Sequence, residues 1–392
     1  MWSGGQPVSE DTLDMDGKKV CEMRKDSITA TEPKRLCDKG GDDINAHVVT
    51  LYEQQSRLYQ QDETQRRRYF SKHPTFFGCL KCMDGRVEIP TMTKTARGIV
   101  KPYRAIGGKF ELFWPAFQNS ISHWIKNAAA HGEHSCILLT SHFCSVKREL
   151  GCKGWENDRD AARRHMEMLA RQMGEDYGEQ LVAIPTSVDT AFDELILHGP
   201  RGDISGASLR DKDIATIRKD IRRAFPQMPI QVIKDLAPFL HGNAQRVTEL
   251  KSNPRSIQEM EHDERVIAIG EGFDGLTTDN FALMNSDVNP NLDSALVIAA
   301  QIIEQKVVSS AIQAMVFTNI FFGSDRGILH NLPGMDKRCA VRRSRGLQEF
   351  AQNHIRKQCP ALWRSGRLHF LTAVTRESTR ELEVIEQGMV ES

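Results

Sequence analysis

Short apolar runs alternate with amphipathic segments along the first half of the chain. The runs are "FFGCLKC", "SCILLTSHF" and "EQLVAIPTSV", and the segments between them include "FWPAFQNSISHWIKNAAAHG" and "ENDRDAARRHMEMLARQM". An apolar run of this length is typical of a buried strand, and apolar residues at helical spacing are typical of a helix that covers a sheet. Because such alternation indicates parallel β-α-β units, we predict an α/β fold with a mostly parallel sheet flanked by helices.

The same order of elements recurs beyond Pro254. "RVIAIGEGFDGL" is similar to "TFFGCLKCMDGR", "AMVFTNIFFGS" to "CILLTSHFCS", and "GRLHFLTAV" to "EQLVAIPTSV". The shared order predicts a degenerate internal duplication. In this alignment Gly272 lies opposite Cys82 and Ile320 lies opposite His142. Because the second copy lacks the thiol and the imidazole, we expect these side chains to serve chemistry in the first copy rather than folding.

Composition and periodicity divide the chain into five segments. Residues 1–42 contain few large apolar side chains and are predicted to be mostly disordered. Ile44, Val48, Leu51 and Leu58 fall on one helical stripe, which predicts a helix within residues 43–72. The remaining segments are a first α/β domain at 73–191, a helical connector at 192–255 and the degenerate second copy at 256–388.

The balance of charge argues against a polyanionic partner. Lys plus Arg and Asp plus Glu number 52 each, so we expect neither nucleic acid nor a membrane surface as a partner, and a small or neutral ligand instead. The sequence contains no apolar run of about 18 residues and no basic, apolar leader. Nine scattered cysteines indicate free thiols or metal ligands. A soluble protein of the reducing cytoplasm is therefore expected.

A cysteine, an aspartate and an arginine alternate where the first apolar run ends. Cys82, Asp84 and Arg86 share one side if the strand extends that far. A thiolate is a strong zinc ligand, and catalytic zinc sites use three protein ligands with one position left for water. His142 ends the next predicted strand and offers a second ligand. Two cysteines follow it, Cys144 and Cys152, and either could be the third.

A site of this composition would activate water. Zinc lowers the pKa of a bound water from 15.7 to about 7, which supplies hydroxide at neutral pH. Arg86 beside Asp84 would keep the carboxylate ionised and able to orient that nucleophile. The alternative is structural: Cys82 and His142 as core residues, and Asp84 with Arg86 as an ion pair. "CLKC" could also be a redox pair, although the chain has no second CxxC.

These residues resemble a known family. "CMDGR" is similar to the Cys-x-Asp-x-Arg motif of the β-class carbonic anhydrases, and "YRAIGG" to the turn that follows it. "SHFCSVKRELGC", together with the duplication, resembles the divergent carboxysomal (carboxysome shell) branch. In that branch "SHF" is followed after a longer loop by "GC", and the second copy carries no metal. The resemblance implies Cys82, His142 and Cys152 as zinc ligands and Asp84 with Arg86 as the catalytic dyad. Cys144 would be a bystander.

The resemblance also implies an activity and a setting. It implies Zn²⁺ as cofactor, reversible hydration of CO2 to bicarbonate, and a β-carbonic-anhydrase-like catalytic domain at residues 73–191. The expected partners are CO2 and bicarbonate, further copies of the chain and components of a carboxysome, inside which the protein would lie if it is not free in the cytoplasm. Two other functions stay open: hydrolysis of CS2 or COS by the same zinc site, and a non-catalytic scaffold protein with a closed structural zinc.

Overall fold

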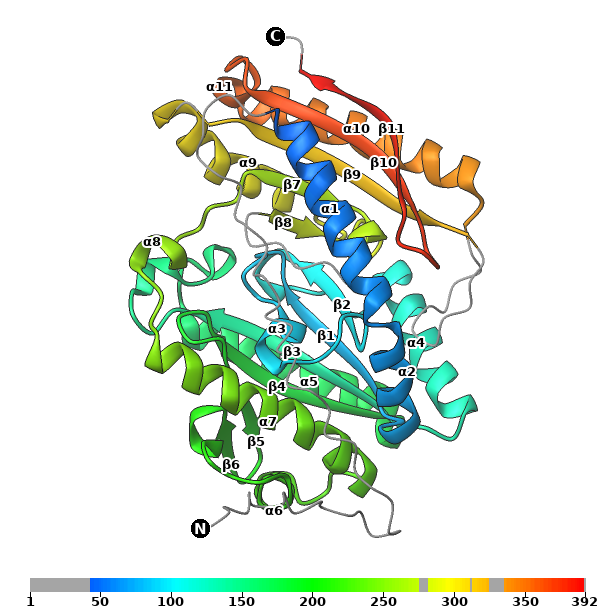
Figure 1. Cartoon of the computed structure of the whole chain (residues 1–392), viewed down its shortest axis with the longest axis vertical. Coiled ribbons are helices and arrows are strands. Elements are labelled where there is room, and N and C mark those ends of the chain that lie inside the picture. The colour runs from blue at the N-terminus through cyan, green and yellow to red at the C-terminus, as the bar shows by residue number, and fades with distance from the viewer. Residues whose placement is uncertain (1–42, 275–280, 311, 324–334, 391–392) are drawn as a thin grey trace, which may run out of the picture. The chain divides into compact units, whose positions relative to one another are not determined.

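The computed structural model describes residues 43–274, 281–310, 312–323 and 335–390 (Figure 1). The segment 1–42, predicted to be disordered, lies outside the described residues. The helix predicted within residues 43–72 is confirmed as two helices, α1 (Ile44–Gln61) and α2 (Glu63–Lys72). Asp43 caps α1 because its side chain accepts a hydrogen bond from the backbone N–H of Asn45.

The first sheet has six strands in the order β2-β1-β3-β4-β5-β6. β1 to β4 pair in parallel, whereas β5 and β6 are antiparallel additions at one edge. The strands are β1 (Phe76–Cys82), β2 (Val100–Ala105), β3 (Ser135–Phe143), β4 (Leu181–Asp189), β5 (Glu194–Gly199) and β6 (Gly202–Ser205). The expected α/β class with a mostly parallel sheet is therefore confirmed.

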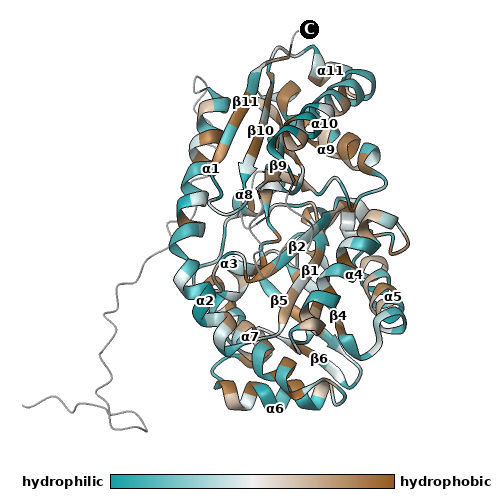
Figure 2. Ribbon diagram, turned by 90° about the vertical axis from the view of Figure 1, so that its right-hand side faces the viewer, coloured by the Kyte–Doolittle hydropathy of each residue, from teal (hydrophilic) through white to brown (hydrophobic). Residues whose placement is uncertain are grey.

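Helices cover both faces of this sheet. One face packs on α4 (Pro115–Ala130) and α5 (Arg159–Tyr177), and the other on α3 (Ile89–Thr93), α6 (Ile214–Ala224) and α7 (Ile230–Ser252). The segment 192–255, expected to be a helical connector, therefore belongs to the first sheet: it supplies two strands and two covering helices. Its apolar residues face the sheet, and hydrophobic positions are brown in Figure 2.

The second sheet has five strands in the order β11-β10-β9-β7-β8. Its elements are α8 (Ile257–Met260), β7 (Val266–Ile269), β8 (Phe281–Met284), α9 (Leu292–Ser309), β9 (Ala314–Phe322), α10 (Lys337–Gln358), α11 (Pro360–Trp363), β10 (Leu368–Arg376) and β11 (Leu382–Met389). β7 to β10 pair in parallel, and β11 is antiparallel. The N-terminal helix α1 covers one face, while α9 and α10 cover the other (Figure 1).

The two sheets meet where β1 ends. Gly85 donates a backbone hydrogen bond to the carbonyl of Phe281 at 3.0 Å, and Leu283 donates one to Met83 at 2.8 Å. Asp84 and Ala282 form an isolated antiparallel bridge between these bonds. The edge strand β8 thus lies against the residues that follow β1, and the second half of the chain borders the predicted site.

Among the described residues, no helix is long and apolar enough to cross a membrane.

A buried carboxylate fixes the start of β1. Asp235 of α7 is fully buried and accepts hydrogen bonds from the backbone N–H and the hydroxyl of Thr75 at 3.0 and 2.6 Å. The side chains of His73 and Gln231 also contact it, at 3.0 and 2.8 Å. Since Thr75 directly precedes β1, this cluster sets the position from which β1 runs to Cys82.

Asp235→Asn is expected to lower the free energy of unfolding by about 1–3 kcal/mol. The reason is that an amide NH2 group, which donates, replaces one carboxylate oxygen, which accepts, beside the buried N–H of Thr75. Urea unfolding followed by circular dichroism measures the change. Gln231→Ala is the matched control, since it removes a single hydrogen bond and should cost about 1 kcal/mol or less. Equal stability of Asp235→Asn and the wild type would contradict this account.

Candidate metal centre

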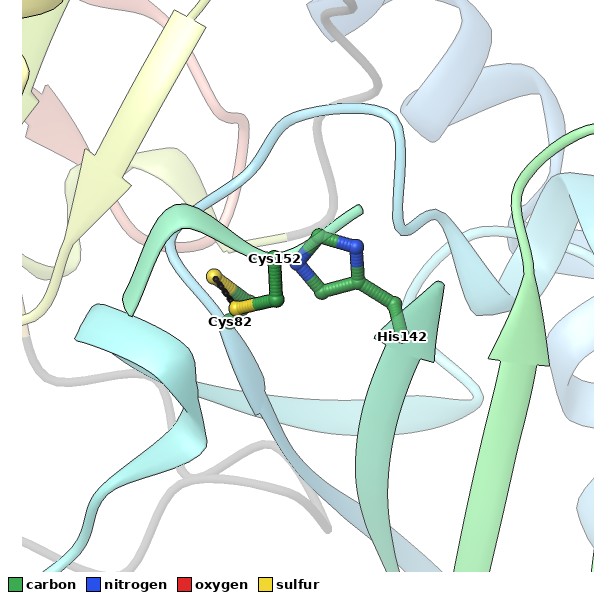
Figure 3. Close-up of side chains that lie close together, drawn as sticks. All are labelled: Cys82, His142 and Cys152. Carbon is green, nitrogen blue, oxygen red and sulfur yellow. Dashed lines mark hydrogen bonds between the residues drawn. The ribbon is translucent and has the colours of Figure 1, made fainter. Parts of the chain in front are cut away.

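Cys82, His142 and Cys152 lie together at the carboxyl ends of β1 and β3 (Figure 3). Cys82 is the last residue of β1, His142 lies one residue before the end of β3, and Cys152 directly precedes the short 3-10 helix η3 (Lys153–Trp155). The side chains are 5%, 3% and 3% exposed. The two sulfur atoms are 3.9 Å apart, and the ligand atoms of all three lie within 4.8 Å of one another.

The donor set fits a metal ion. Neither ring nitrogen of His142 has a hydrogen-bond partner among the described residues, although both are buried. A buried polar atom without a partner is costly, and a metal ion would satisfy one of these nitrogens. Two sulfur ligands and one imidazole suit zinc, and a site with three protein ligands keeps a fourth position open. The group could therefore hold a metal ion.

The two thiols share a proton unequally. The hydrogen bond from Cys152 holds the pKa of Cys82 well below its usual range, although burial opposes this and His142 assists it. The same hydrogen bond, with burial, raises the pKa of Cys152 well above its usual range. These directions favour Cys82 as the first of the two thiols to lose its proton, and a metal ion bound by both sulfur atoms would also displace the proton of Cys152.

Two glycine contacts bring Cys152 to the other ligands. Gly154 lies so close to Gly107 that a Cβ on Gly154 would stand 2.8 Å from the Cα and N atoms of Gly107. Gly107 has a φ of +60°, and its carbonyl accepts a hydrogen bond from the indole N–H of Trp155 at 2.7 Å. The "YRAIGG" turn therefore receives the loop that carries Cys152, and both glycines are required by this close approach.

Gly154→Ala is expected to weaken zinc binding about tenfold, because the added methyl group pushes the Cys152 loop away from Gly107. Zinc affinity measured by competition with a chromogenic chelator tests this. Gly174→Ala is the control: a Cβ at Gly174 of α5 meets no atom within 4 Å, and its zinc affinity should equal that of the wild type. A Gly154→Ala protein with wild-type affinity would show that the loop tolerates the displacement.

Asp84 and Arg86 form a buried ion pair beside the three ligands. Nη2 of Arg86 lies 2.6 Å from Oδ2 of Asp84, and Nε lies 3.0 Å from Oδ1. Oδ2 of Asp84 is 3.8 Å from Nε2 of His142. Burial alone would raise the pKa of Asp84, but the guanidinium of Arg86, with a smaller contribution from His142, holds it well below its usual range. The carboxylate is ionised and faces the metal centre.

Arg86 also reaches residues that the sequence analysis does not identify. Its guanidinium donates to the carbonyls of Met260 at 2.5 Å and Leu150 at 3.2 Å. It also contacts the ring of His262, which in turn contacts Glu264. Met260, His262 and Glu264 lie in the charged stretch "EMEHDER", whose sequence shows no helical or strand periodicity.

The structure distinguishes the two cysteines that follow β3. Within the described part of the chain, Cys152 belongs to the group of ligand atoms and Cys144 does not. Cys144 is buried in a separate small cluster with Leu150, Ala191 and Met260. Cys79 is also buried on β1, but its sulfur lies 3.8 Å from the hydroxyl of Thr140, away from the group. The "CLKC" pair is thus divided between two environments.

Comparison with known proteins adds no family to these observations. A scan of the chain against protein-family models finds no match, and a search of the curated proteins finds none either.

Proposed function

We propose that this protein is a zinc-dependent carbonic anhydrase that interconverts CO2 and bicarbonate, similar to the β class and to its carboxysomal branch. The observation that carries the proposal is the buried Cys82, His142 and Cys152 group beside the ion pair of Asp84 and Arg86. The motif "CMDGR" and the "SHF" to "GC" spacing support the same family.

The protein side chains around the metal have separate roles in this proposal. Zinc would supply a water molecule activated as a nucleophile at neutral pH. The carboxylate of Asp84 would accept a hydrogen bond from that water and orient it, and Arg86 holds Asp84 ionised and in place. Apolar side chains packed with Cys82 and Cys152 exclude bulk water and suit a small nonpolar substrate; they include Met83, Ile106, Ile267, Ala282 and Met284.

A degenerate duplication accounts for the matching topology of the two sheets. The order β2-β1-β3-β4-β5 and its strand directions recur as β8-β7-β9-β10-β11. β3 and β9 both have nine residues and pair end to end with the nine-residue strands β4 and β10. Matching these strands places Phe321 at the position of His142 and Glu271 at that of Cys82. The alignment from sequence alone placed Gly272 opposite Cys82 and Ile320 opposite His142. Each of these positions therefore differs by one residue from the match between the strands.

An ion network takes the place of metal ligands at the corresponding end of the second sheet. Glu271 accepts hydrogen bonds from the N–H and hydroxyl of Ser286 at 3.1 and 3.0 Å. Arg343 donates to the hydroxyl of Ser286 at 2.8 Å and pairs with Asp287. Among the described residues, no group of three Cys, His, Asp or Glu ligands forms there. This supports a second copy without metal. Carboxysome residence and assembly into a homo-oligomer stay predictions.

The first test is CO2 hydration by the purified full chain with and without a chelator, together with metal analysis of Cys152→Ser and Cys144→Ser. We expect a chelator-sensitive rate and bound zinc in the wild type, loss of both in Cys152→Ser, and retention of both in Cys144→Ser. Zinc retained in Cys152→Ser but lost in Cys144→Ser would overturn the ligand assignment.

The same preparation separates the alternative functions. Hydrolysis of COS or CS2 without CO2 hydration would identify the site as that of a related hydrolase. Bound zinc with neither activity would identify a structural zinc in a scaffold protein. Such a closed zinc needs a fourth protein ligand, and one candidate is Asp84, whose Oδ2 is 3.8 Å from Nε2 of His142 and whose two oxygens are held by Arg86.

Arg86→Ala is expected to keep zinc and to lower the hydration rate by about 10²-fold, because Asp84 is no longer held and is free to occupy the open metal position. Stopped-flow CO2 hydration and metal analysis measure the two quantities. Arg86→Lys keeps the charge but not the planar fork, and an intermediate rate is expected. Full activity of Arg86→Ala would count against the role of the ion pair.

A further inference from the structure

A segment outside residues 73–191 contacts the ion pair directly. This segment runs from the end of α8 to the start of β7 and contains Met260, His262 and Glu264. The carbonyl of Met260 accepts a hydrogen bond from Nη1 of Arg86 at 2.5 Å. The ring of His262 lies against the same guanidinium, with Nη2 of Arg86 3.0 Å from Nε2. The segment thus contacts the guanidinium of Arg86 at two places.

The ring nitrogens of His262 both face acceptors. Nδ1 lies 3.0 Å from Oε1 of Glu264, and Nε2 lies 3.0 Å from the carbonyl oxygen of Gly151. Since a carboxylate and a carbonyl can only accept, a proton on either nitrogen has an acceptor beside it. Nη2 of Arg86 is also within hydrogen-bond distance of both ring nitrogens, 3.0 Å from Nε2 and 3.3 Å from Nδ1.

Charged groups of both signs surround His262. Arg86 and the imidazole ring face two carboxylates: Glu264, and Asp84, whose Oδ2 is 3.7 Å from Nδ1 of His262. Burial lowers the pKa of His262, but the hydrogen bond to Glu264 and its charge outweigh this, and the net change is upward. The imidazole is thereby packed between one guanidinium and two carboxylates at the edge of the candidate metal centre.

A second metal ion does not explain this cluster. Asp84, His262 and Glu264 place one ligand atom each within 4.8 Å of one another. A cation among them would face the guanidinium of Arg86, which is bonded to Asp84 at 2.6 Å and lies 3.0 Å from Nε2 of His262. Arg86 already occupies the position of the positive charge.

The bond from His262 to Gly151 reaches the metal ligands. Gly151 directly precedes Cys152, and Leu150, one residue earlier, accepts a hydrogen bond from Arg86. His262 and Arg86 together therefore hold two successive carbonyls of the loop that carries the third ligand.

We propose that His262, oriented by Glu264, is a positioning residue of the metal centre. It keeps the guanidinium of Arg86 against Asp84. Through the carbonyl of Gly151 it also fixes the backbone before Cys152 beside that guanidinium. The proposal rests on the proposed metal centre, and it makes the second half of the chain a part of that centre. Groups around a metal site that orient the ligands typically change affinity or activity by about 10–100-fold when removed.

The test uses His262→Ala and His262→Gln in the full chain, with His354→Ala as control. His354, on α10, also bonds a carbonyl through Nδ1 and packs against a ring, but it lies on a helix that does not reach the ion pair. Hydrogen exchange of residues 148–155 is measured in the metal-free protein, zinc affinity by chelator competition, and CO2 hydration by stopped flow.

For His262→Ala we expect about tenfold faster exchange confined to residues 148–155, about tenfold weaker zinc binding and about tenfold lower kcat with little change in KM. His262→Gln, whose amide can still donate to Gly151, should recover part of each loss. A merely structural histidine would lower stability throughout and would not produce a local change in exchange or partial rescue by Gln.

Exchange and zinc affinity within about twofold of the wild type in a folded His262→Ala protein would overturn the proposal. If His262→Ala does not fold, Glu264→Ala decides: it removes the acceptor that orients Nδ1, and an unchanged exchange rate in residues 148–155 would again overturn the proposal. Absence of CO2 hydration in the wild type would remove the proposed function alone, because exchange and zinc affinity are measured without substrate.

Discussion

One buried guanidinium joins three segments that are far apart in the sequence. Arg86 binds Asp84 at the end of β1, the carbonyl of Leu150 in the loop before Cys152, and the carbonyl of Met260 before β7. A buried cation that loses its partners costs several kcal/mol, so each segment is held where the others require it. Two of the three candidate ligands, Cys82 and Cys152, lie beside the first two segments. Their arrangement therefore depends on the third, which belongs to the second half of the chain.

Backbone pairing makes the same dependence stronger. β8 pairs with the residues just after Cys82, and the apolar side chains of β7 and β8 pack in one cluster with Cys82 and Cys152. The first half supplies the candidate ligands, and apolar side chains of both halves pack around Cys82 and Cys152. Low local polarity strengthens both the ion pair of Asp84 with Arg86 and any metal–thiolate bond. A centre built in this way is intact only when both sheets are in contact.

The sequence allowed us to predict which strand ends lie side by side, but not which residues the loops contact. The carboxyl ends of parallel strands meet at one edge, so Cys82 and His142 could be expected to lie together once their apolar runs are recognised as strands. The sequence did not predict β5 and β6, because the amphipathic helices within residues 192–255 dominate the hydrophobic pattern of that segment. His262 was missed because it lies in a loop 176 residues from Arg86, where no periodicity points to a partner. The choice of Cys152 over Cys144 came from a resemblance, since both follow His142 within a loop.

Charge balance explains how the second sheet can fold without a metal if it arose by duplication. A zinc ion with two thiolates and one neutral imidazole has no net charge, so its burial costs little beyond the ligands themselves. Removing the metal from such a position would leave unpaired polar groups. Arg343, with Glu271 and Asp287, supplies positive and negative charge in the same region and bonds the hydroxyl of Ser286. A guanidinium can balance carboxylates in this way, but it cannot offer an open coordination position to water. Replacing the metal and its ligands by these charged side chains would therefore preserve the fold and abolish metal-dependent chemistry. The second half could then cover the candidate metal centre of the first half and position its residues.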